Sequence, residues 1–324
     1  GNPAMEHLAL GLPVASLAYP PFRPLFTQGR MATTLELGWR RNLPAYLFPL
    51  PGGFVGGDLV AFLFGLSRAP RSGALYLDLG TNAEMALFDG ERFLATSAAA
   101  GPAFEGGNLS CGMPALPGAI SAVGIEGDRL RLTTIAGEPA RGICGSGVLD
   151  AVAALLSAGV IDPSGRLLPP SEIPSNLANR VQEVEGAPAF VLHRDAKRVV
   201  YLSQEDIRAL QLAKGAMRGG MEILLEKGGL SFGELSEVVL TGSFGAVLSP
   251  EMLKNVGIFS ENMVRISGFV REGALAGVER LLTEPDGVAK VEALAATVRV
   301  IPLSGTPVFE KRFLANIDFP KTKA

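Results

Sequence analysis

The sequence contains few of the residues that mark disulfide frameworks, metal clusters or nucleic-acid binding. Its 324 residues include two cysteines, two histidines and one tryptophan. Two cysteines cannot build a disulfide framework, and two histidines leave little material for a histidine-rich metal site or a catalytic triad. The formal net charge is -3 and no dense run of Lys and Arg occurs, so nucleic acid is not an expected partner.

Long hydrophobic runs are also missing. No stretch of 18 or more apolar residues occurs, which argues against a transmembrane helix and a membrane partner. The first ten residues contain no Lys or Arg ahead of their apolar side chains and carry Glu6 among them, unlike a signal peptide. Together with the low cysteine content, these features predict a cytoplasmic protein.

Glycine, in contrast, is abundant. The chain has 40 glycines and 48% hydrophobic residues, enough apolar material for a large core in one to three domains. Clustered glycines mark turns and places where the backbone comes close to a ligand. Such clusters occur at Gly52-Gly53, Gly56-Gly57, Gly106-Gly107, Gly219-Gly220 and Gly228-Gly229.

Hydrophobic periodicity predicts alternating strands and helices. We expect helices over residues 5–10, 55–66, 148–158, 207–227 and 271–282. We expect strands within 74–88, over 92–97, within 120–135, and over 238–241, 264–266 and 298–302. Residues 17–50 are rich in proline and are expected to be irregular. Ser203 and Asp206 form a near capping box at the start of the long helix.

The first motif with chemical potential runs from Asp78 to Asn82, with the sequence Asp-Leu-Gly-Thr-Asn. A carboxylate at a strand end followed by a tight turn can hold a hydrated Mg²⁺ through Asp78. The backbone N–H groups of the turn and the Thr81 hydroxyl can bind phosphate oxygens. Because the motif is short, an ordinary hairpin corner explains it equally well.

Two further glycine-rich motifs are open to structural and functional interpretations. Gly142 to Gly147 begins a helix, where free N–H groups attract anions, but close helix packing would also require glycine. Thr241 to Gly245 follows a buried strand, and its glycines would let the backbone lie flat against a nucleoside. A simple turn between strand and helix is the alternative. Neither motif is a dinucleotide fingerprint or a Walker loop.

The order of the motifs along the chain resembles the acetate and sugar kinase, heat-shock chaperone and actin superfamily. The resemblance implies an α/β fold, the actin-like ATPase fold of ribonuclease H-like lobes with a nucleotide cleft, whose first lobe is incomplete here. It makes Asp78 and Thr81 catalytic, with Asp78 binding Mg²⁺ through water. It places the contacts to ATP or ADP at Gly80, Asn82, Gly106, Gly107, Gln211, Lys214, Gly215, Gly242, Ser243, Phe244 and Gly245.

A narrower resemblance is to the reductive activator of corrinoid proteins family. It rests on phrases in matching order at Gly1 to Leu8, Asp78 to Glu84, Gly101 to Gly106, Cys111 to Met113, Gly142 to Gly147, Gln211 to Ala216 and Gly242 to Gly245. These phrases cover nearly the whole chain. Where the family has Asn-Ser before Ala274, this chain has Glu272-Gly273.

This family resemblance implies a function. Members use ATP to return an inactive cobalt(II) corrinoid protein of a methyltransferase system to the cobalt(I) state, with electrons from an upstream [2Fe-2S] ferredoxin domain. The chain lacks the cysteine spacing of such a cluster and the first Asp-Gly-Thr phosphate loop. We therefore expect this chain by itself to be inactive. The expected parts are 1–70, the remainder of the first lobe with a connecting helix; 71–270, the second lobe; and 271–324, a second connecting helix and C-terminal segment.

Two alternatives remain at this stage. The chain could be a nucleotide-gated binding scaffold, or an ATPase similar to dehydratase activators, with an iron-sulfur cluster shared between the subunits of a homodimer through Cys111 and Cys144. Buried, inert cysteines are the commoner situation. The glycine-rich loop from Gly101 to Met113 is a candidate partner surface, with Phe104 expected to be exposed or half-exposed.

Overall fold

The computed structural model describes residues 3–242 and 248–321, and its centre is a mixed sheet with the strand order β13-β12-β3-β4-β5-β14. Strands β13, β12 and β3 are parallel, β3, β4 and β5 form an antiparallel meander, and β14 is parallel to β5. The strands are β3 (Ala74–Leu79), β4 (Ala83–Phe88), β5 (Phe93–Ala98), β12 (Glu237–Thr241), β13 (Ser267–Phe269) and β14 (Val298–Val300).

Alternate residues of this sheet face two different cores, because successive strand side chains point to opposite faces. Leu75, Leu77 and Met85 belong to the core under the long helix α5 (Gln204–Lys227). Their neighbours Tyr76 and Ala86 belong to the core under α3 (Gly57–Phe64). Both faces are covered, which explains why the strands read as nearly continuous apolar runs.

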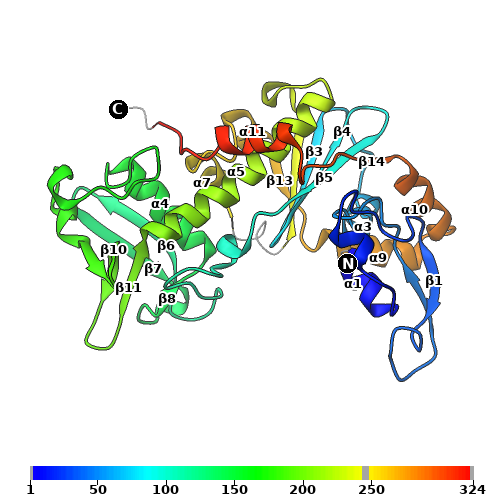
Figure 1. Cartoon of the computed structure of the whole chain (residues 1–324), viewed down its shortest axis with the longest axis horizontal. Helices are drawn as coiled ribbons and strands as arrows, with labels where there is room; N and C mark the ends of the chain where they lie inside the picture. The colour runs from blue at the N-terminus through cyan, green and yellow to red at the C-terminus, as the bar shows by residue number, and fades with distance from the viewer. Residues whose placement is uncertain (1–2, 243–247, 322–324) are drawn as a thin grey trace.

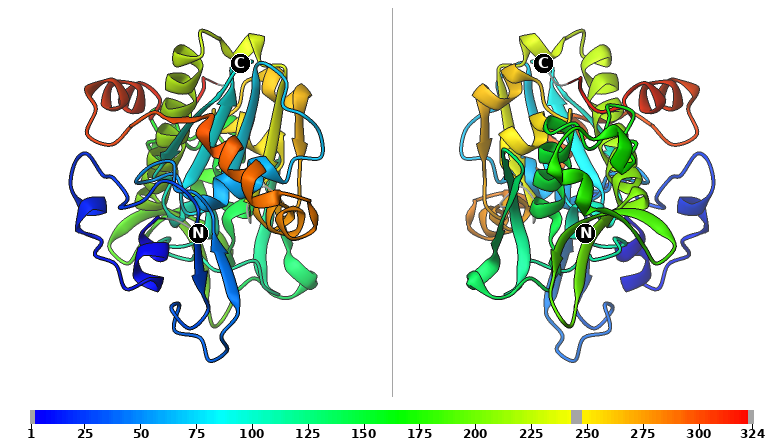
Figure 2. Two further views of the ribbon diagram at one scale, coloured as in Figure 1. Left: turned by 90° about the vertical axis from the view of Figure 1, so that its right-hand side faces the viewer. Right: turned by 90° about the vertical axis from the view of Figure 1, so that its left-hand side faces the viewer.

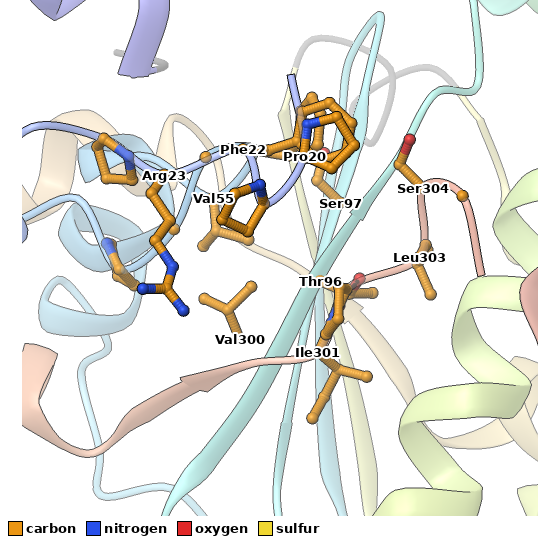
Figure 3. Close-up of a pocket in the computed structure, with 18 of the residues that line it drawn as sticks. Pro20, Phe22, Arg23, Val55, Thr96, Ser97, Val300, Ile301, Leu303 and Ser304 are labelled. Atoms are coloured by element: carbon orange, nitrogen blue, oxygen red, sulfur yellow. Dashed lines mark hydrogen bonds between the residues drawn. The ribbon is translucent and has the colours of Figure 1, made fainter. Parts of the chain in front are cut away.

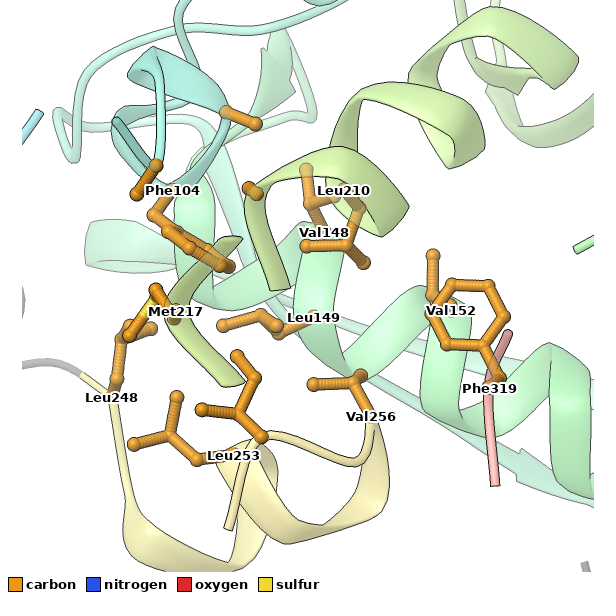
Figure 4. Close-up of a cluster of buried hydrophobic side chains, with 14 of the residues drawn as sticks. Phe104, Val148, Leu149, Val152, Leu210, Met217, Leu248, Leu253, Val256 and Phe319 are labelled. Carbon is orange, nitrogen blue, oxygen red and sulfur yellow. The ribbon is translucent and has the colours of Figure 1, made fainter. Parts of the chain in front are cut away.

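Helix α5 begins where the sequence predicts it. The Ser203 hydroxyl accepts a hydrogen bond from the Asp206 N–H at 3.1 Å, and the Asp206 carboxylate accepts one from the Ser203 N–H at 2.8 Å. These two bonds complete a capping box and satisfy backbone donors at the helix start. Met217 and Leu210 of α5 pack with side chains of α4 (Gly145–Ser157) and α7 (Pro250–Asn255) in one continuous core (Figure 4).

Two glycine-bearing helices pack closely on the opposite side of the sheet. Helix α9 (Gly273–Thr283) lies against α3, with α10 (Gly287–Ala296) beside both. A Cβ atom at Gly277 would overlap the carbonyl of Ala61, and one at Gly65 would be pressed against the Gly277 N–H. Glycine is therefore required for this helix contact, which joins the two segments expected to be connecting helices.

A separate block of smaller sheets extends from one end of the central sheet (Figures 1 and 2). It contains the sheet β7-β6-β8 and the sheet β11-β10-β9, with α4 packed on β6. The strands are β6 (Ala119–Glu126), β7 (Arg129–Thr134), β8 (Gly142–Ile143), β9 (Val181–Val184), β10 (Ala187–Arg194) and β11 (Val199–Ser203). Helices α9 and α10 lie at the other end of the molecule.

The N-terminal region differs from the irregular segment expected over residues 17–50. It contains α1 (Pro3–Ala9), the short α2 (Ala15–Ala18) and an antiparallel hairpin of β1 (Arg30–Thr33) and β2 (Pro44–Leu47). The two strands are separated by ten residues, so no short turn signal marked them in the sequence. His7 is fully buried and accepts a hydrogen bond from the Leu25 N–H at 3.0 Å, so it packs within the N-terminal region.

Two other expectations are corrected. Residues 264–266 are not a strand but the end of α8 (Glu261–Ile266), because Ser260 caps this helix through the Met263 N–H, and the strand starts at Ser267. Phe104 is not exposed: it is 4% exposed and packs in the main core, within the 3-10 turn η1 (Pro102–Glu105). The loop from Gly101 to Met113 thus uses its aromatic side chain for packing.

The C-terminal segment returns across α5. Helix α11 (Pro307–Ala315) runs alongside α5 (Figure 1), and Phe319 is buried in the main core. In the part of the chain that the structure describes, no helix is both long and apolar enough to cross a membrane.

Candidate functional site

Four polar residues form a row across the central sheet, at the edge where strands β12, β3 and β5 end. Thr241 pairs with Asp78, Asp78 pairs with Glu84, and Glu84 pairs with Ser97. Directly paired residues point to the same face of a sheet, and here that face lies under α3. The alternation that buries Tyr76 and Ala86 on this side therefore also brings the polar row to it. We call these four residues the polar row.

The segments after β3 and β12 meet at one end of the polar row. Gly242 has a φ of +89°, a conformation that favours glycine. A Cβ atom at this position would overlap the Asp78 carboxylate and the backbone of Leu79. The two loops predicted to bind phosphate and adenosine thus start side by side, because the parallel strands β3 and β12 end at the same edge of the sheet.

The carboxylates of this edge have raised pKa values. Burial raises the pKa of Asp78 to about 6, and the neighbouring Asp58 carboxylate adds to the effect. Burial likewise raises the pKa of Glu84 to about 8, with Asp58 and Asp78 contributing, although a hydrogen bond from the Ser97 hydroxyl at 3.2 Å opposes the shift. Asp58 lies in the first turn of α3. Among the described residues, no salt bridge involves these three carboxylates.

A cavity of about 420 Å³ opens beside Asp78. Asp78, Thr241 and Gly242 line one side of it, and the start of α9 with Arg271 lines the other. The Thr241 hydroxyl accepts a hydrogen bond from the Gly273 N–H at 2.9 Å, which fixes α9 to the end of β12. The Arg271 side chain is 84% exposed, so a basic group stands near the carboxylates without being paired to them.

The turn after Asp78 has the geometry of a tight corner. The Gly80 N–H donates to the Asn82 carbonyl at 3.0 Å. Thr81 is exposed, and its hydroxyl donates to Glu105 at 2.6 Å. This bond links the turn to η1, and a phosphate group binding to the Thr81 hydroxyl would replace the Glu105 carboxylate as its acceptor.

Two other glycine motifs are explained by close packing. A Cβ atom at Gly145 would overlap the Phe104 carbonyl, and one at Gly147 would overlap the Ile120 carbonyl, so the start of α4 is pressed against both segments. Within the loop from Gly101 to Met113, a Cβ atom at Gly106 would press against the Met113 carbonyl and one at Gly107 against Pro102. These contacts give each glycine a structural reason.

The cysteines lie in different surroundings. Cys144 is buried, and its thiol donates to the Ile120 carbonyl at 3.3 Å. Cys111 is half-buried, and burial raises the pKa of its thiol. The raised pKa disfavours the Cys111 thiolate that would bind iron or another metal, and Cys144 is buried in the packed interior. These surroundings favour the inert interpretation of both residues.

The α5 residues predicted to lie near adenine are covered by the C-terminal segment. Lys214 is 2% exposed, and its ammonium group donates to the carbonyls of Asn316 and Asp318 at 2.5 and 2.7 Å. Burial lowers the pKa of Lys214 to about 8, with Arg218 adding to the shift and Asp318 opposing it. Gln211 donates to the Ile317 carbonyl at 3.1 Å.

The α5 helix backbone at Gly215 lies under Phe313. Together we call Gln211, Lys214 and Gly215 with their C-terminal partners the Lys214 face. Ser243, Phe244 and Gly245 lie outside the described residues.

The sequence did not lead us to predict Asp58, Glu84 and Ser97 as site residues. Counting alternate positions from Asp78 through the meander would have placed Glu84 and Ser97 in the same row.

Several known proteins are similar to this chain. A relative from Eubacterium limosum named corrinoid activation enzyme RamQ is 30% identical over 334 residues, covering 98% of this chain and 55% of the relative. The Co(II) methylated amine-specific corrinoid protein reductase of Methanosarcina barkeri is 30% identical over 211 residues, covering 57% of this chain and 34% of that protein.

A solved structure, the reductive activator for corrinoid, iron-sulfur protein, superposes with a TM-score of 0.87 at 28% identity, covering all of this chain and 52% of that one. The chain thus spans about half the length of the first of these relatives and of the solved structure. The family model for the C-terminal ASKHA domain of RACo matches residues 72–324, and that for the RACo middle region matches residues 1–67. The chain therefore belongs to the RACo family, and its central sheet is that of an actin-like ATPase domain.

Proposed function

We propose that this chain binds ATP and ADP at the edge of the central sheet, between the turn after Asp78 and the loop that begins at Gly242. The observation that carries this proposal is the close approach of Gly242 to Asp78 and Leu79 beside a cavity of about 420 Å³. Gly80, Thr81 and Asn82 would bind phosphate oxygens through backbone N–H groups and the Thr81 hydroxyl. Residues 242–245 would contact the nucleoside.

The carboxylates at this edge suit a hydrated Mg²⁺ ion. Asp78 and Glu84 have raised pKa values because burial and neighbouring negative charge disfavour their ionised forms, and a divalent cation would reverse this effect. In the described part of the chain, no three His, Cys, Asp or Glu side chains are grouped to hold a metal ion. Mg²⁺ usually needs only one or two carboxylates, since waters and phosphates complete its coordination. Asp78 would hold it through water, and the bound ion would neutralise charge on the phosphates.

The predicted contacts between α5 and adenine require a rearrangement of the C-terminal segment. Gln211 and Lys214 already donate to carbonyls of residues 316–318. If these side chains contact the nucleotide, the C-terminal segment has to leave them first. Gly106 and Gly107, which pack within their own loop, would contribute only backbone groups.

We infer a role for the longer protein from the relatives. Corrinoid activation and corrinoid protein reduction are the activities named for them, and the same activity here would be the one-electron reduction of a cobalt(II) corrinoid protein to cobalt(I). The electron would come from a [2Fe-2S] ferredoxin domain upstream of this chain, and the partner would be the corrinoid protein of a methyltransferase system. ATP would drive the reduction if nucleotide binding and the cobalt oxidation state favour different conformations of the two lobes.

Titration calorimetry of the chain with ADP and Mg²⁺ tests the nucleotide site. The Gly242→Val variant should lose affinity by about a hundredfold or more, because its side chain would overlap the Asp78 carboxylate in a conformation that β-branched residues avoid. Thr81→Ala should lose about tenfold, the usual effect of losing one hydrogen bond to a charged group.

Cys111→Ser is the matched control and should bind ADP as the unmodified chain does, since Cys111 lies in the separate β-sheet block, beside the Tyr201 N–H. Equal affinities for all three variants would rule out the proposed site. The redox role is tested separately, with the full-length protein and its corrinoid partner, by following the cobalt(I) absorption after ATP is added.

A further inference from the structure

A second cavity adjoins the polar row, with which it shares Ser97. It has a volume of about 640 Å³ and is lined by four segments that are distant in sequence: residues 20–27, 51–55, 96–97 and 300–305 (Figure 3). None of its lining residues lines the cavity beside Asp78. Its volume falls in the range of small-molecule sites.

The walls of this cavity are largely apolar. Phe22 and Phe54 bring their rings to a centroid distance of 5.0 Å on one side. Val55 and Val300 contribute aliphatic surface, and Val55 is only 1% exposed. Several prolines complete this lining. Such walls bind an apolar or aromatic body by removing its surface from water.

One charged side chain, that of Arg23, lines the cavity. In Figure 3 it extends from the N-terminal segment toward Val300. Among the described residues, no salt bridge or side-chain hydrogen bond of Arg23 is found. The backbone around it is nevertheless fixed, because the Arg23 N–H donates to the Ser16 carbonyl at 2.9 Å and the Leu25 N–H donates to His7 at 3.0 Å.

The opposite end of the cavity adjoins the polar row. Ser97 lines the cavity, and its hydroxyl donates to the Glu84 carboxylate at 3.2 Å. The neighbouring Thr96 hydroxyl is used internally, since it donates to the Ile301 carbonyl at 2.7 Å. A buried acidic side chain therefore lies behind Ser97, whereas the exposed Arg23 carries a positive charge that has no partner among the described residues. A ligand with one anionic group would place that group at Arg23 and its apolar body along Phe22 and Val300.

We propose that this cavity is a binding site for a small amphipathic anion, an apolar or aromatic molecule that bears one carboxylate, sulfonate or phosphate group. Arg23 pairs with the anionic group, and the walls around Phe22, Phe54 and Val300 hold the apolar body. The site is distinct from the proposed nucleotide site and does not depend on it.

Two fluorescent probes test this assignment with the chain as it is. The anion 1-anilinonaphthalene-8-sulfonate and the neutral N-phenyl-1-naphthylamine share an aromatic body and differ in the sulfonate. Arg23→Gln should weaken binding of the anion about tenfold, the effect of one charge-assisted contact, and leave the neutral probe within twofold. Arg30→Gln, which changes an exposed arginine of β1 outside the cavity, should leave both affinities unchanged.

Ser304→Trp tests the location, because a large side chain at this cavity-lining position should compete with both probes for the same space. Titration with ADP and Mg²⁺ should not displace the anion. The proposal is overturned if Arg23→Gln weakens neither probe, or both equally. It is also overturned if Ser304→Trp leaves both bound, or if ADP competes with the anion.

Discussion

Two groups of charged residues, both selected from the same family motifs, have opposite surroundings in this structure. At the end of the polar row, Asp78 has a raised pKa and the cavity beside it is open. At the Lys214 face, the ammonium group is 2% exposed and donates to two carbonyls of the C-terminal segment. The Asp78 carboxylate has no hydrogen bond or salt bridge with the described residues, whereas Lys214 has several partners.

This difference is the one expected between a residue that binds a ligand and a residue that stabilises the fold. A buried charge that the protein itself does not neutralise costs folding free energy and suits a ligand that supplies the opposite charge. A buried charge with good hydrogen-bond partners holds two segments together, and removing it leaves those partners unsatisfied. The same motif can contain both kinds, so a match to a family phrase does not assign a role to each of its residues.

The largest effect on stability is expected at the Lys214 face. Lys214→Met should lower the free energy of unfolding by about 3 kcal/mol, because the carbonyls of Asn316 and Asp318 lose their buried donor. The contact of the ammonium group with the Phe319 ring is lost as well. Urea denaturation measures the change, and hydrogen exchange should show faster exchange at the Phe319 amide, which donates to the Pro163 carbonyl.

Lys227→Met is the matched control on the same helix. Lys227 is exposed near the end of α5, so its replacement should change stability by less than about 0.5 kcal/mol. If Lys214→Met leaves stability unchanged but weakens ADP binding, the comparison fails and Lys214 belongs to the nucleotide site.

At the polar row, removing a charge is expected to raise the free energy of unfolding rather than lower it. The pKa of Asp78 is about 6 in the folded protein and 3.8 for an unperturbed side chain. The folded state therefore binds more protons between these values, and Asp78 lowers stability as the pH rises through this window. Asp78→Asn should raise the free energy of unfolding at pH 7 by about 2 kcal/mol, somewhat less than the full shift implies because Asp78 is partly exposed.

The pH dependence provides the check on this second prediction. The stability difference between Asp78→Asn and the unmodified chain should be small at pH 4, grow up to about pH 6.5 and then stay level. Binding of ADP with Mg²⁺ should be weakened by the same substitution. Glu91→Gln, at an exposed turn, should show neither effect. A destabilised Asp78→Asn variant would mean that the carboxylate has a structural partner.

Much of the fold could be predicted from local sequence. The meander of β3, β4 and β5 follows from strand patterns with glycine corners, and the start of α5 follows from Ser203 and Asp206. The contact of α3 with α9 rests on Gly65 and Gly277, which the superfamily resemblance had placed in connecting helices. These features depend on short segments whose propensities and packing agree.

The remaining features depend on contacts between distant segments. The burial of Phe104 is set by α4 and α5, and the burial of Lys214 is set by residues about 100 positions further along the chain. The polar row depends on the registers in which β3 pairs with β4 and β4 pairs with β5. Glu84 and Ser97 were therefore not predicted as site residues. The cavity at Arg23 combines four separate segments. No local pattern contains this information.

The smallest expected effect concerns how the C-terminal segment is held on α5. Arg312 of α11 forms ion pairs with Glu226 at 2.9 Å and Glu222 at 3.8 Å, and the Arg312 side chain is 44% exposed. Exposed pairs contribute little because water and salt screen them. Arg312→Ala should therefore lower the free energy of unfolding by about 0.5 kcal/mol at low salt, and less at 0.5 M NaCl. If its effect equals that of Lys214→Met, the segment is held by its exposed ion pairs, and the contrast between a buried, partnered lysine and an unpartnered carboxylate would lose its energetic basis.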